Sequence, residues 1–301
     1  MKSLLLLLGV SALSLPLASL GQGPSVVFGH QQLIEYQPGN LPLIISAPHG
    51  GTIRPEGMPN RSFGRIAQDS NTQEITRLLK EEVAARYGAP PYIIICRLHR
   101  MKMDANREIK EAAQDNPIAV QAWNDFQGFI KGARQSVNKK FGHGLYIDLH
   151  GQRHPENRVE LGYLLTAEQL RLPDANLNGD KMLAIKTSVR ELTMRTSVSF
   201  ADLIRGPTSL GAMLERRGFA SVPSPVSPAP LANEEYYSGG YNTAMHSSLH
   251  GGAISGLQIE CPWKGVRDKP ENQRKFARAL AEALGEYWLA HFKSALKGAA
   301  P

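Results

Sequence analysis

Short, wholly apolar runs are the feature of this sequence that most restricts its fold. Tyr92–Cys96 reads YIIIC and Leu43–Ala47 reads LIISA. Runs of this length that lack a polar face and are rich in β-branched residues are typical of strands covered on both sides. Longer segments with helical periodicity separate the runs, among them Pro117–Phe141 and Asn272–Leu296. This alternation predicts an α/β fold with three layers, α/β/α, around a mixed, mostly parallel sheet.

Weaker patterns extend the same prediction. Asp69 is suited to cap a helix whose apolar face includes Ile75 and Val83 and which ends at Gly88. We also expect strands at Leu145–Leu149, Leu161–Leu165 and Leu257–Glu260, and helices at Lys181–Arg195 and Pro207–Arg217. Ser221–Pro230 carries four prolines and no periodicity, so it is interpreted as a surface loop inside the domain.

The first residues predict an export signal that is not part of the fold. Lys2 precedes an apolar run that starts with Leu4–Leu8, and small residues follow up to Gly21. We therefore expect residues 1–21 to be a signal peptide, residues 22–301 to form one catalytic domain, and the protein to be secreted or periplasmic. An uncleaved signal anchor is the alternative. In such a compartment the two cysteines, Cys96 and Cys261, could form a disulfide.

The charge pattern argues against a nucleic-acid-binding protein. The chain has 34 Lys and Arg against 27 Asp and Glu, a formal net charge of +7 over 301 residues. The basic residues are scattered among acids, whereas a nucleic-acid-binding surface gathers them on one element. The expected partner is a small anionic or peptidic substrate, with no nucleic acid and no membrane apart from the signal anchor.

Three predicted strands end in residues that carry chemistry. LIISAPHGG leads to His49, GLYIDLHG to His150 and LQIECP to Glu260. Ligands of open α/β sheets bind beyond the carboxyl ends of the strands, so these side chains are expected at one edge. Two imidazoles with one carboxylate and an open position for water form the ligand set of hydrolytic Zn2+, and a further acid takes the proton from the water. This pattern predicts a hydrolytic zinc site at this edge of the sheet.

Three acidic residues are candidates for the carboxylate that completes the metal site. Glu74 lies in the first turns of the helix after Asp69, and we expect it to be the third ligand because that helix packs on the sheet. Asp69 and Glu56 are the alternatives, with Asp69 equally suited to cap the helix. Asp148 lies two residues before His150, on the same face of the strand, where it can orient the imidazole.

Residues for binding the substrate are expected in two loops. Arg107 offers a planar guanidinium that matches a carboxylate, and the neighbouring Asn106 adds an amide donor. In the glycine-rich stretch GGYNTAMH, Tyr241 is expected to donate to the developing oxyanion. His246 in the same stretch is a further candidate for contact with the substrate or the leaving group.

Five short motifs occur in an order that resembles the N-formylglutamate amidohydrolase family, a branch of the zinc-carboxypeptidase and aspartoacylase superfamily. They are PHGG, DANR, IDLHG, GGYN and QIE, which start at Pro48, Asp104, Ile147, Gly239 and Gln258. The resemblance implies the phosphorylase/hydrolase-like fold of zinc peptidases and an enzyme that cuts an amide bond next to a carboxylate. It implies that His49 and His150 bind the metal, that Glu260 is catalytic and that Asn106 and Arg107 hold a substrate carboxylate. Thr52 stands where carboxypeptidases have a glutamate ligand, so the acid is expected further downstream.

Together these observations predict a secreted zinc-dependent amidohydrolase that acts on an N-acyl amino acid or on a γ-glutamyl or peptide substrate. A zinc carboxypeptidase and a polyglutamate or peptidoglycan amidase are the alternatives within the hydrolases. A protein that has the fold but only binds its ligand is the alternative outside them. Retention of both histidines and of Glu260 favours an enzyme.

Overall fold

The computed structural model describes residues 25–299, so the predicted signal peptide lies outside the described residues. One eight-stranded sheet runs through this part of the chain in the order β1-β2-β4-β3-β5-β8-β6-β7. The strands are β1 (Val27–Phe28), β2 (Ile34–Gln37), β3 (Leu43–Ala47), β4 (Tyr92–Cys96), β5 (Gly144–Gly151), β6 (Val159–Gly162), β7 (Ser221–Val222) and β8 (Ile254–Cys261). The central strands β4, β3, β5 and β8 run parallel to one another, while β1, β2 and β6 add antiparallel pairings.

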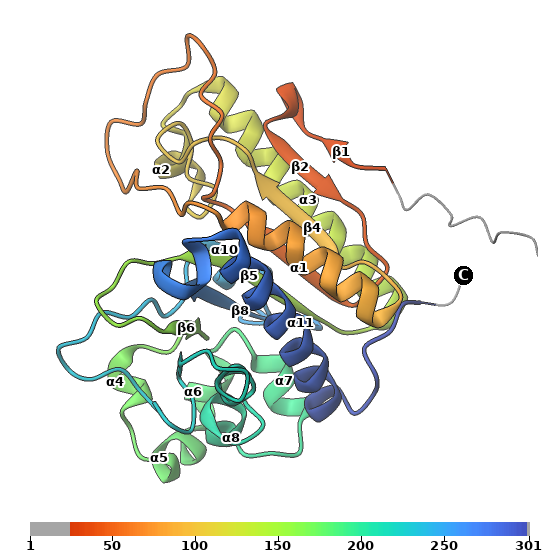
Figure 1. The fold of residues 1–301 in the computed structure, drawn as a ribbon, viewed down its shortest axis with the longest axis vertical. Helices are drawn as coiled ribbons and strands as arrows, with labels where there is room; N and C mark the ends of the chain where they lie inside the picture. Colours follow the sequence, from red (N-terminus) through yellow and green to blue (C-terminus); the bar gives the residue numbers. More distant parts are fainter. Residues whose placement is uncertain (1–24, 300–301) are drawn as a thin grey trace, which may run out of the picture.

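Helices cover both faces of this sheet, as Figure 1 shows. On one face lie α1 (Thr72–Tyr87) and α11 (Pro270–Phe292), and on the other α3 (Pro117–Phe141) with the short α2 (Ile109–Ala113). Two buried clusters of apolar side chains, one on each side of the sheet, form the core. The predicted three-layer α/β/α architecture with a mixed, mostly parallel sheet is confirmed.

The strongest sequence patterns predicted the element bounds well. β3, β4 and α3 begin and end at the predicted residues. Asn116 caps α3 by accepting a hydrogen bond from the Ala119 amide, and Gly142 ends it in the left-handed conformation. The strand predicted at Leu161–Leu165 starts earlier, because β6 pairs with β8 through Glu160, Leu161 and Gly162.

The region between β6 and β8 differs more from the prediction. It contains the short helices α4 (Ala167–Leu170), α5 (Asp174–Gly179), α6 (Lys181–Ile185), α7 (Arg190–Arg195), α8 (Phe200–Arg205), α9 (Leu210–Glu215) and α10 (Tyr241–His246). The helix expected over Lys181–Arg195 is divided in two. At the break the Ser188 amide donates to the Tyr163 carbonyl, and the Ser188 carbonyl accepts from Gly256. These tertiary bonds replace the intrahelical ones.

The two cysteines are free and buried, and they do not form the disulfide considered from the sequence. Cys96 ends β4 and packs in the cluster below α3, whereas Cys261 ends β8 and packs in the cluster below α1 and α11. Two strands, β3 and β5, separate them in the sheet. The two thiols therefore lie on opposite faces of the sheet and on strands that are not neighbours.

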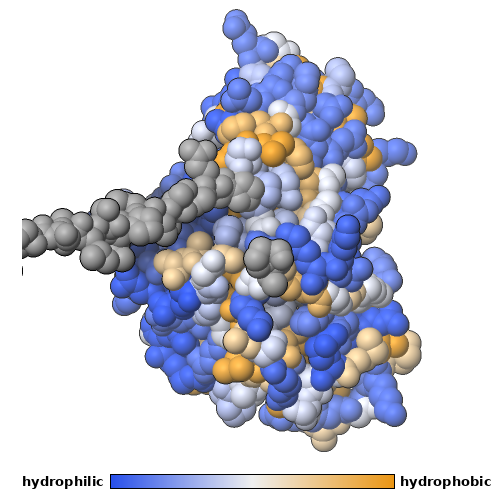
Figure 2. Space-filling model, turned by 90° about the vertical axis from the view of Figure 1, so that its right-hand side faces the viewer, coloured by the Kyte–Doolittle hydropathy of each residue, from blue (hydrophilic) through white to orange (hydrophobic). Residues whose placement is uncertain are grey.

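The surface is mainly hydrophilic on the face shown in Figure 2, where hydrophobic residues lie in small groups between hydrophilic ones. None of the helices that the structure describes combines the length and the apolar composition needed to cross a bilayer.

Candidate metal centre

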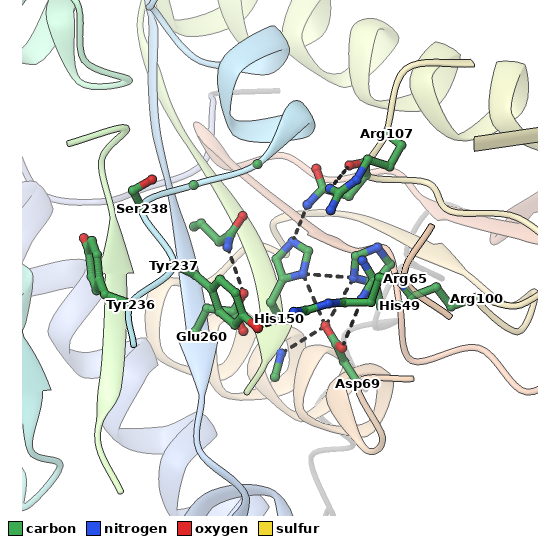
Figure 3. A pocket seen from close by; sticks show the side chains of 15 residues that line it. His49, Arg65, Asp69, Arg100, Arg107, His150, Tyr236, Tyr237, Ser238 and Glu260 are labelled. Carbon is green, nitrogen blue, oxygen red and sulfur yellow. Dashed lines mark hydrogen bonds and ion pairs between the residues drawn. The ribbon is translucent and has the colours of Figure 1, made fainter. Parts of the chain in front are cut away.

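Two histidines and one aspartate bring their ligand atoms together at the carboxyl edge of the central strands. His49 follows β3, His150 lies near the end of β5, and Asp69 lies in the loop before α1. The two Nδ1 atoms are 3.1 Å apart, and Oδ2 of Asp69 lies 3.2 Å from Nδ1 of His49 and 3.3 Å from Nδ1 of His150. All three side chains are buried and line one pocket (Figure 3).

These distances fit a bound divalent metal. Ligands at about 2.0–2.1 Å from a tetrahedral zinc ion lie about 3.3 Å from one another, which is the spacing found here. Two imidazole nitrogens and a carboxylate oxygen are the donors that zinc prefers in hydrolytic sites. His49, Asp69 and His150 could therefore hold a metal ion and leave a fourth position open to the pocket.

Asp69 occupies the place that we expected Glu74 to have, and the prediction of Glu74 is wrong. Glu74 lies on α1 with an exposed side chain and does not line the pocket. Helix α1 begins later than expected, with Asn71 at its N-cap, so Asp69 remains in the preceding loop. Its amide donates to the His49 carbonyl at 3.1 Å, which fixes its carboxylate beside the imidazoles. Glu56, the other alternative, is also exposed.

A buried carboxylate holds the far nitrogen of each histidine. Nε2 of His49 lies 2.7 Å from Oδ1 of Asp104, and Nε2 of His150 lies 2.8 Å from Oδ2 of Asp148. An Nε2–H that donates to a carboxylate leaves the Nδ1 lone pair free for a metal. Asp148 thus has the orienting contact suggested by the sequence, whereas Asp104 was noted only as part of the DANR motif. Burial by itself would raise the pKa of Asp104, but His49 and Arg100 hold it well below its usual range.

Glu260 lies next to this centre with one oxygen free. It pairs with His150 in the parallel register of β5 and β8. Its Oε1 accepts a hydrogen bond of 2.8 Å from Nε2 of Gln258, and its Oε2 is buried without a partner among the described residues. Burial raises the pKa of Glu260 to about 8, with His150 opposing and Asp69 and Glu160 adding to the rise. A carboxyl group with this pKa can both accept and return a proton near neutral pH.

Three arginines line the pocket, of which the sequence analysis singled out one for substrate binding. Arg107 is about one-third exposed. Its Nε donates a hydrogen bond to Oε1 of Glu111 at 3.2 Å, and its Nη1 donates to the Asn106 carbonyl at 2.8 Å. Arg65 and Arg100 also face the pocket, whose volume is about 270 Å³. Guanidinium groups in a small pocket favour a substrate that carries a carboxylate.

Asn106 lines the pocket and also holds part of its wall. Its Oδ1 accepts from the Asn242 amide at 2.8 Å, and its Nδ2 lies 3.3 Å from Nε2 of His150. Asn106 therefore positions the glycine-rich loop at the pocket wall through its Oδ1. Because the Nε2–H of His150 donates to Asp148, the Nδ2 amide of Asn106 remains available, and its expected contact with a substrate carboxylate beside Arg107 stays a prediction.

Tyr241 and His246 lie outside the pocket, contrary to expectation. Tyr241 packs against Trp123 with ring centroids 6.1 Å apart, and His246 is buried with Nε2 on Oε1 of Gln127 at 2.5 Å. Tyr237 takes the pocket position instead, and its hydroxyl contacts the Arg65 guanidinium (Figure 3). The sequence YYSGGYN contains both tyrosines, and only the start of α10 at Tyr241 decides which one faces the site.

Comparisons with known proteins place the fold. No protein-family model matches this chain, and no curated protein matches it by sequence. A gene product from Agrobacterium tumefaciens has a similar structure, with a TM-score of 0.53 at 11% identity over 87% of this chain and 96% of its own. An N-formylglutamate amidohydrolase from Ralstonia eutropha JMP134 has a TM-score of 0.49 at 13% identity, over 89% of this chain and 97% of its own. A succinylglutamate desuccinylase from Chromobacterium violaceum has a TM-score of 0.40 at 11% identity, over 93% and 76%.

At these identities the likeness concerns the fold alone. The Agrobacterium structure shares the arrangement of helices and strands over most of both chains. The similar structures include one described as an N-formylglutamate amidohydrolase, which is the family that the sequence motifs resemble. The chemistry of the site has to be argued from its own residues.

Proposed function

We propose that this protein is a zinc-dependent hydrolase that cleaves an amide bond in a small substrate bearing a carboxylate. The observation that carries the proposal is the meeting of His49, His150 and Asp69 within 3.3 Å of one another, beside a glutamate with a free oxygen. A structural metal site would be closed by a fourth protein ligand, whereas this group opens into a pocket.

Each pocket residue has a role in this proposal. Zinc held by His49, Asp69 and His150 would polarise a water molecule and the scissile carbonyl. Glu260 accepts a proton from the water through its free Oε2 and passes it to the leaving nitrogen. Arg107 binds a substrate carboxylate with the guanidinium edge that Glu111 and Asn106 leave open. Tyr237 donates a hydrogen bond to the substrate, the role first expected of Tyr241.

The size of the pocket supports a small substrate over a polymer. A volume of about 270 Å³ suits an N-acyl amino acid or a short γ-glutamyl compound. A polyglutamate or peptidoglycan amidase needs room for chain on both sides of the scissile bond. A carboxypeptidase remains the nearer alternative, because its substrate would also place a terminal carboxylate on Arg107. Export, proposed from residues 1–21, would place the reaction outside the cytosol.

The test combines metal analysis with a substrate panel on the mature protein. We expect about one zinc per chain, loss of activity after chelation and recovery on addition of zinc. The panel compares N-formyl, N-acetyl and N-succinyl amino acids with glutamyl peptides and with peptides that have a free carboxyl terminus. Glu260→Gln should lower kcat by about 10²–10⁴-fold with zinc still bound. Stoichiometric zinc without turnover of any amide would instead support the ligand-binding alternative.

A further inference from the structure

Arg134 projects from α3 between two hollows that are separate from the catalytic pocket. The hollows have volumes of about 370 and 290 Å³, and Arg134 and Lys131 line both. The larger one is also lined by Trp123, Tyr241 and Met245. The wall between it and the catalytic pocket includes Trp123, whose indole N–H donates to the Arg107 carbonyl at 2.9 Å.

The Arg134 guanidinium has no acidic partner within residues 25–299. Its Nε is buried without a hydrogen bond, and burial lowers its pKa with only the Tyr146 phenol acting in the other direction. Several other arginines have a carboxylate partner, as Arg205 has Asp174 and Arg217 has Glu282. A partly buried guanidinium gains from a counter-charge. An anion from outside the chain would supply the counter-charge that Arg134 lacks among residues 25–299.

The surroundings of Arg134 indicate what kind of anion fits. The rings of Trp123 and Tyr241 stand 6.1 Å apart, and Met245 lies exposed next to them. Trp123 and Tyr241 therefore give the larger hollow an aromatic part of its wall, in addition to its basic residues. Gly128 lies on the helix surface below, where a side chain would meet no protein atom within 4 Å. The space can thus hold a flat ring above α3 with its charged end toward Arg134 and Lys131.

We propose that Arg134 anchors a second binding site, distinct from the catalytic pocket, for a small aromatic carboxylate. Arg134 binds the carboxylate, Lys131 adds positive charge at the rim, and Trp123 and Tyr241 pack against the ring. The site does not depend on the hydrolase activity, because it shares no lining residue with the catalytic pocket.

Benzoate is the probe for this site, with benzamide as its uncharged counterpart. Isothermal titration calorimetry of the mature protein should detect benzoate, and benzamide should bind at least about ten-fold more weakly. Arg134→Gln should weaken benzoate by a similar factor, while Arg107→Gln should leave this binding in place. The proposal is overturned if Arg134→Gln binds benzoate as the unmodified protein does, or if Arg107→Gln abolishes all binding.

Two glycines of α3 provide a test that leaves the charges untouched. Gly128 and Gly132 both have open space at the position of a Cβ, and of the two only Gly128 lines a hollow. Gly128→Leu should fill the hollow and abolish benzoate binding, whereas Gly132→Leu should bind like the unmodified protein. Thermal unfolding shows that each variant folds, and benzoate should raise Tm more for Gly132→Leu than for Gly128→Leu or Arg134→Gln. Equal benzoate binding by both leucine variants would contradict the proposed site.

Discussion

The two histidines of the candidate metal centre both turn Nδ1 toward the proposed ion position, but different groups support them. Asp104, behind His49, lies against two guanidiniums, with Arg100 Nε at 2.9 Å and Arg61 Nη1 at 3.8 Å. Asp148, behind His150, is held by two hydroxyls, with Ser46 Oγ at 2.5 Å and the Tyr146 hydroxyl at 3.2 Å.

Asp104 pairs with two guanidiniums as well as with His49, whereas Asp148 contacts no guanidinium in the described part of the chain. Both carboxylates are fully buried, so neither charge is screened by water. The comparison indicates that Asp104 belongs to an ion-pair network that stabilises the fold. Asp148 mainly changes how strongly His150 would bind a metal. Removing each carboxylate should therefore affect different properties of the protein.

The largest effect on stability is expected from Asp104→Asn. The substitution removes the most buried carboxylate from Arg61 and Arg100, which keep Glu111 at 3.9 Å and Asp69 at 3.8 Å, and breaking a buried pair costs about 3–5 kcal/mol. Urea unfolding of the metal-free protein in the presence of a chelator measures the loss. If the midpoint does not move, Glu111 and Asp69 compensate for Asp104 and the proposed contrast between the two supports fails.

Asp148→Asn should mainly weaken metal binding. It removes the negative charge behind His150, and changes of this kind lower zinc affinity by about 10–100-fold. The metal-free protein should lose less stability than Asp104→Asn does, because Asp148 contacts no guanidinium of residues 25–299 and His150 keeps a carboxylate neighbour in Asp69 at 3.3 Å. Competition with a chromophoric chelator gives the zinc affinity of both variants. The zinc affinities are corrected for the fraction of unfolded protein. If Asp148→Asn then loses less zinc affinity than Asp104→Asn, Asp104 and not Asp148 is the carboxylate that mainly supports metal binding.

A smaller effect is expected from Tyr146→Phe. The change removes one hydrogen-bond donor from Asp148 and should cost about 1 kcal/mol of stability, with a few-fold loss of zinc affinity. Tyr163→Phe is the matched control, since that hydroxyl is buried without a partner among the described residues. Calorimetric unfolding of the two variants should separate them, and equal losses would show that the contact with Asp148 contributes nothing.

The smallest effect is expected from Glu74→Gln. This exposed residue of α1 contacts neither support, so zinc affinity should be unchanged and stability should stay within about 0.5 kcal/mol. Asp69→Asn is the informative partner, because it alters a residue that lies 3.2–3.3 Å from both imidazoles. Loss of zinc from Glu74→Gln together with retention by Asp69→Asn would restore the ligand set first expected from the sequence.

The parts of the site that lie on strands could be predicted from the sequence. Asp148 and His150 lie two residues apart on one strand, so strand periodicity alone puts their side chains on one face. Glu260 follows from the rule that parallel strands present their carboxyl ends at one edge. Apolar runs without a polar face likewise gave β3 and β4 their correct bounds.

Features that depend on loops could not be predicted in this way. The exact start of α1 decides between Asp69 and Glu74, and helix ends are poorly specified by sequence. Arg65, Arg100 and Tyr237 reach the pocket from segments whose path is set by tertiary contacts, such as the bond of 2.9 Å from the Tyr237 amide to Glu160. The short helices between β6 and β8 have too little periodicity to be told from loops.

One consequence of the ligand positions concerns the segment between β3 and α1. The ligand at its start, His49, and the ligand at its end, Asp69, are 20 residues apart, and His150 lies a further 81 residues along the chain. An ion held by all three would close this segment into a ring, as a covalent staple does, and would reduce the number of conformations open to it. Arg65 sits inside that ring and lines the pocket. Loading the ion and shaping the wall that meets the substrate would thus be a single event.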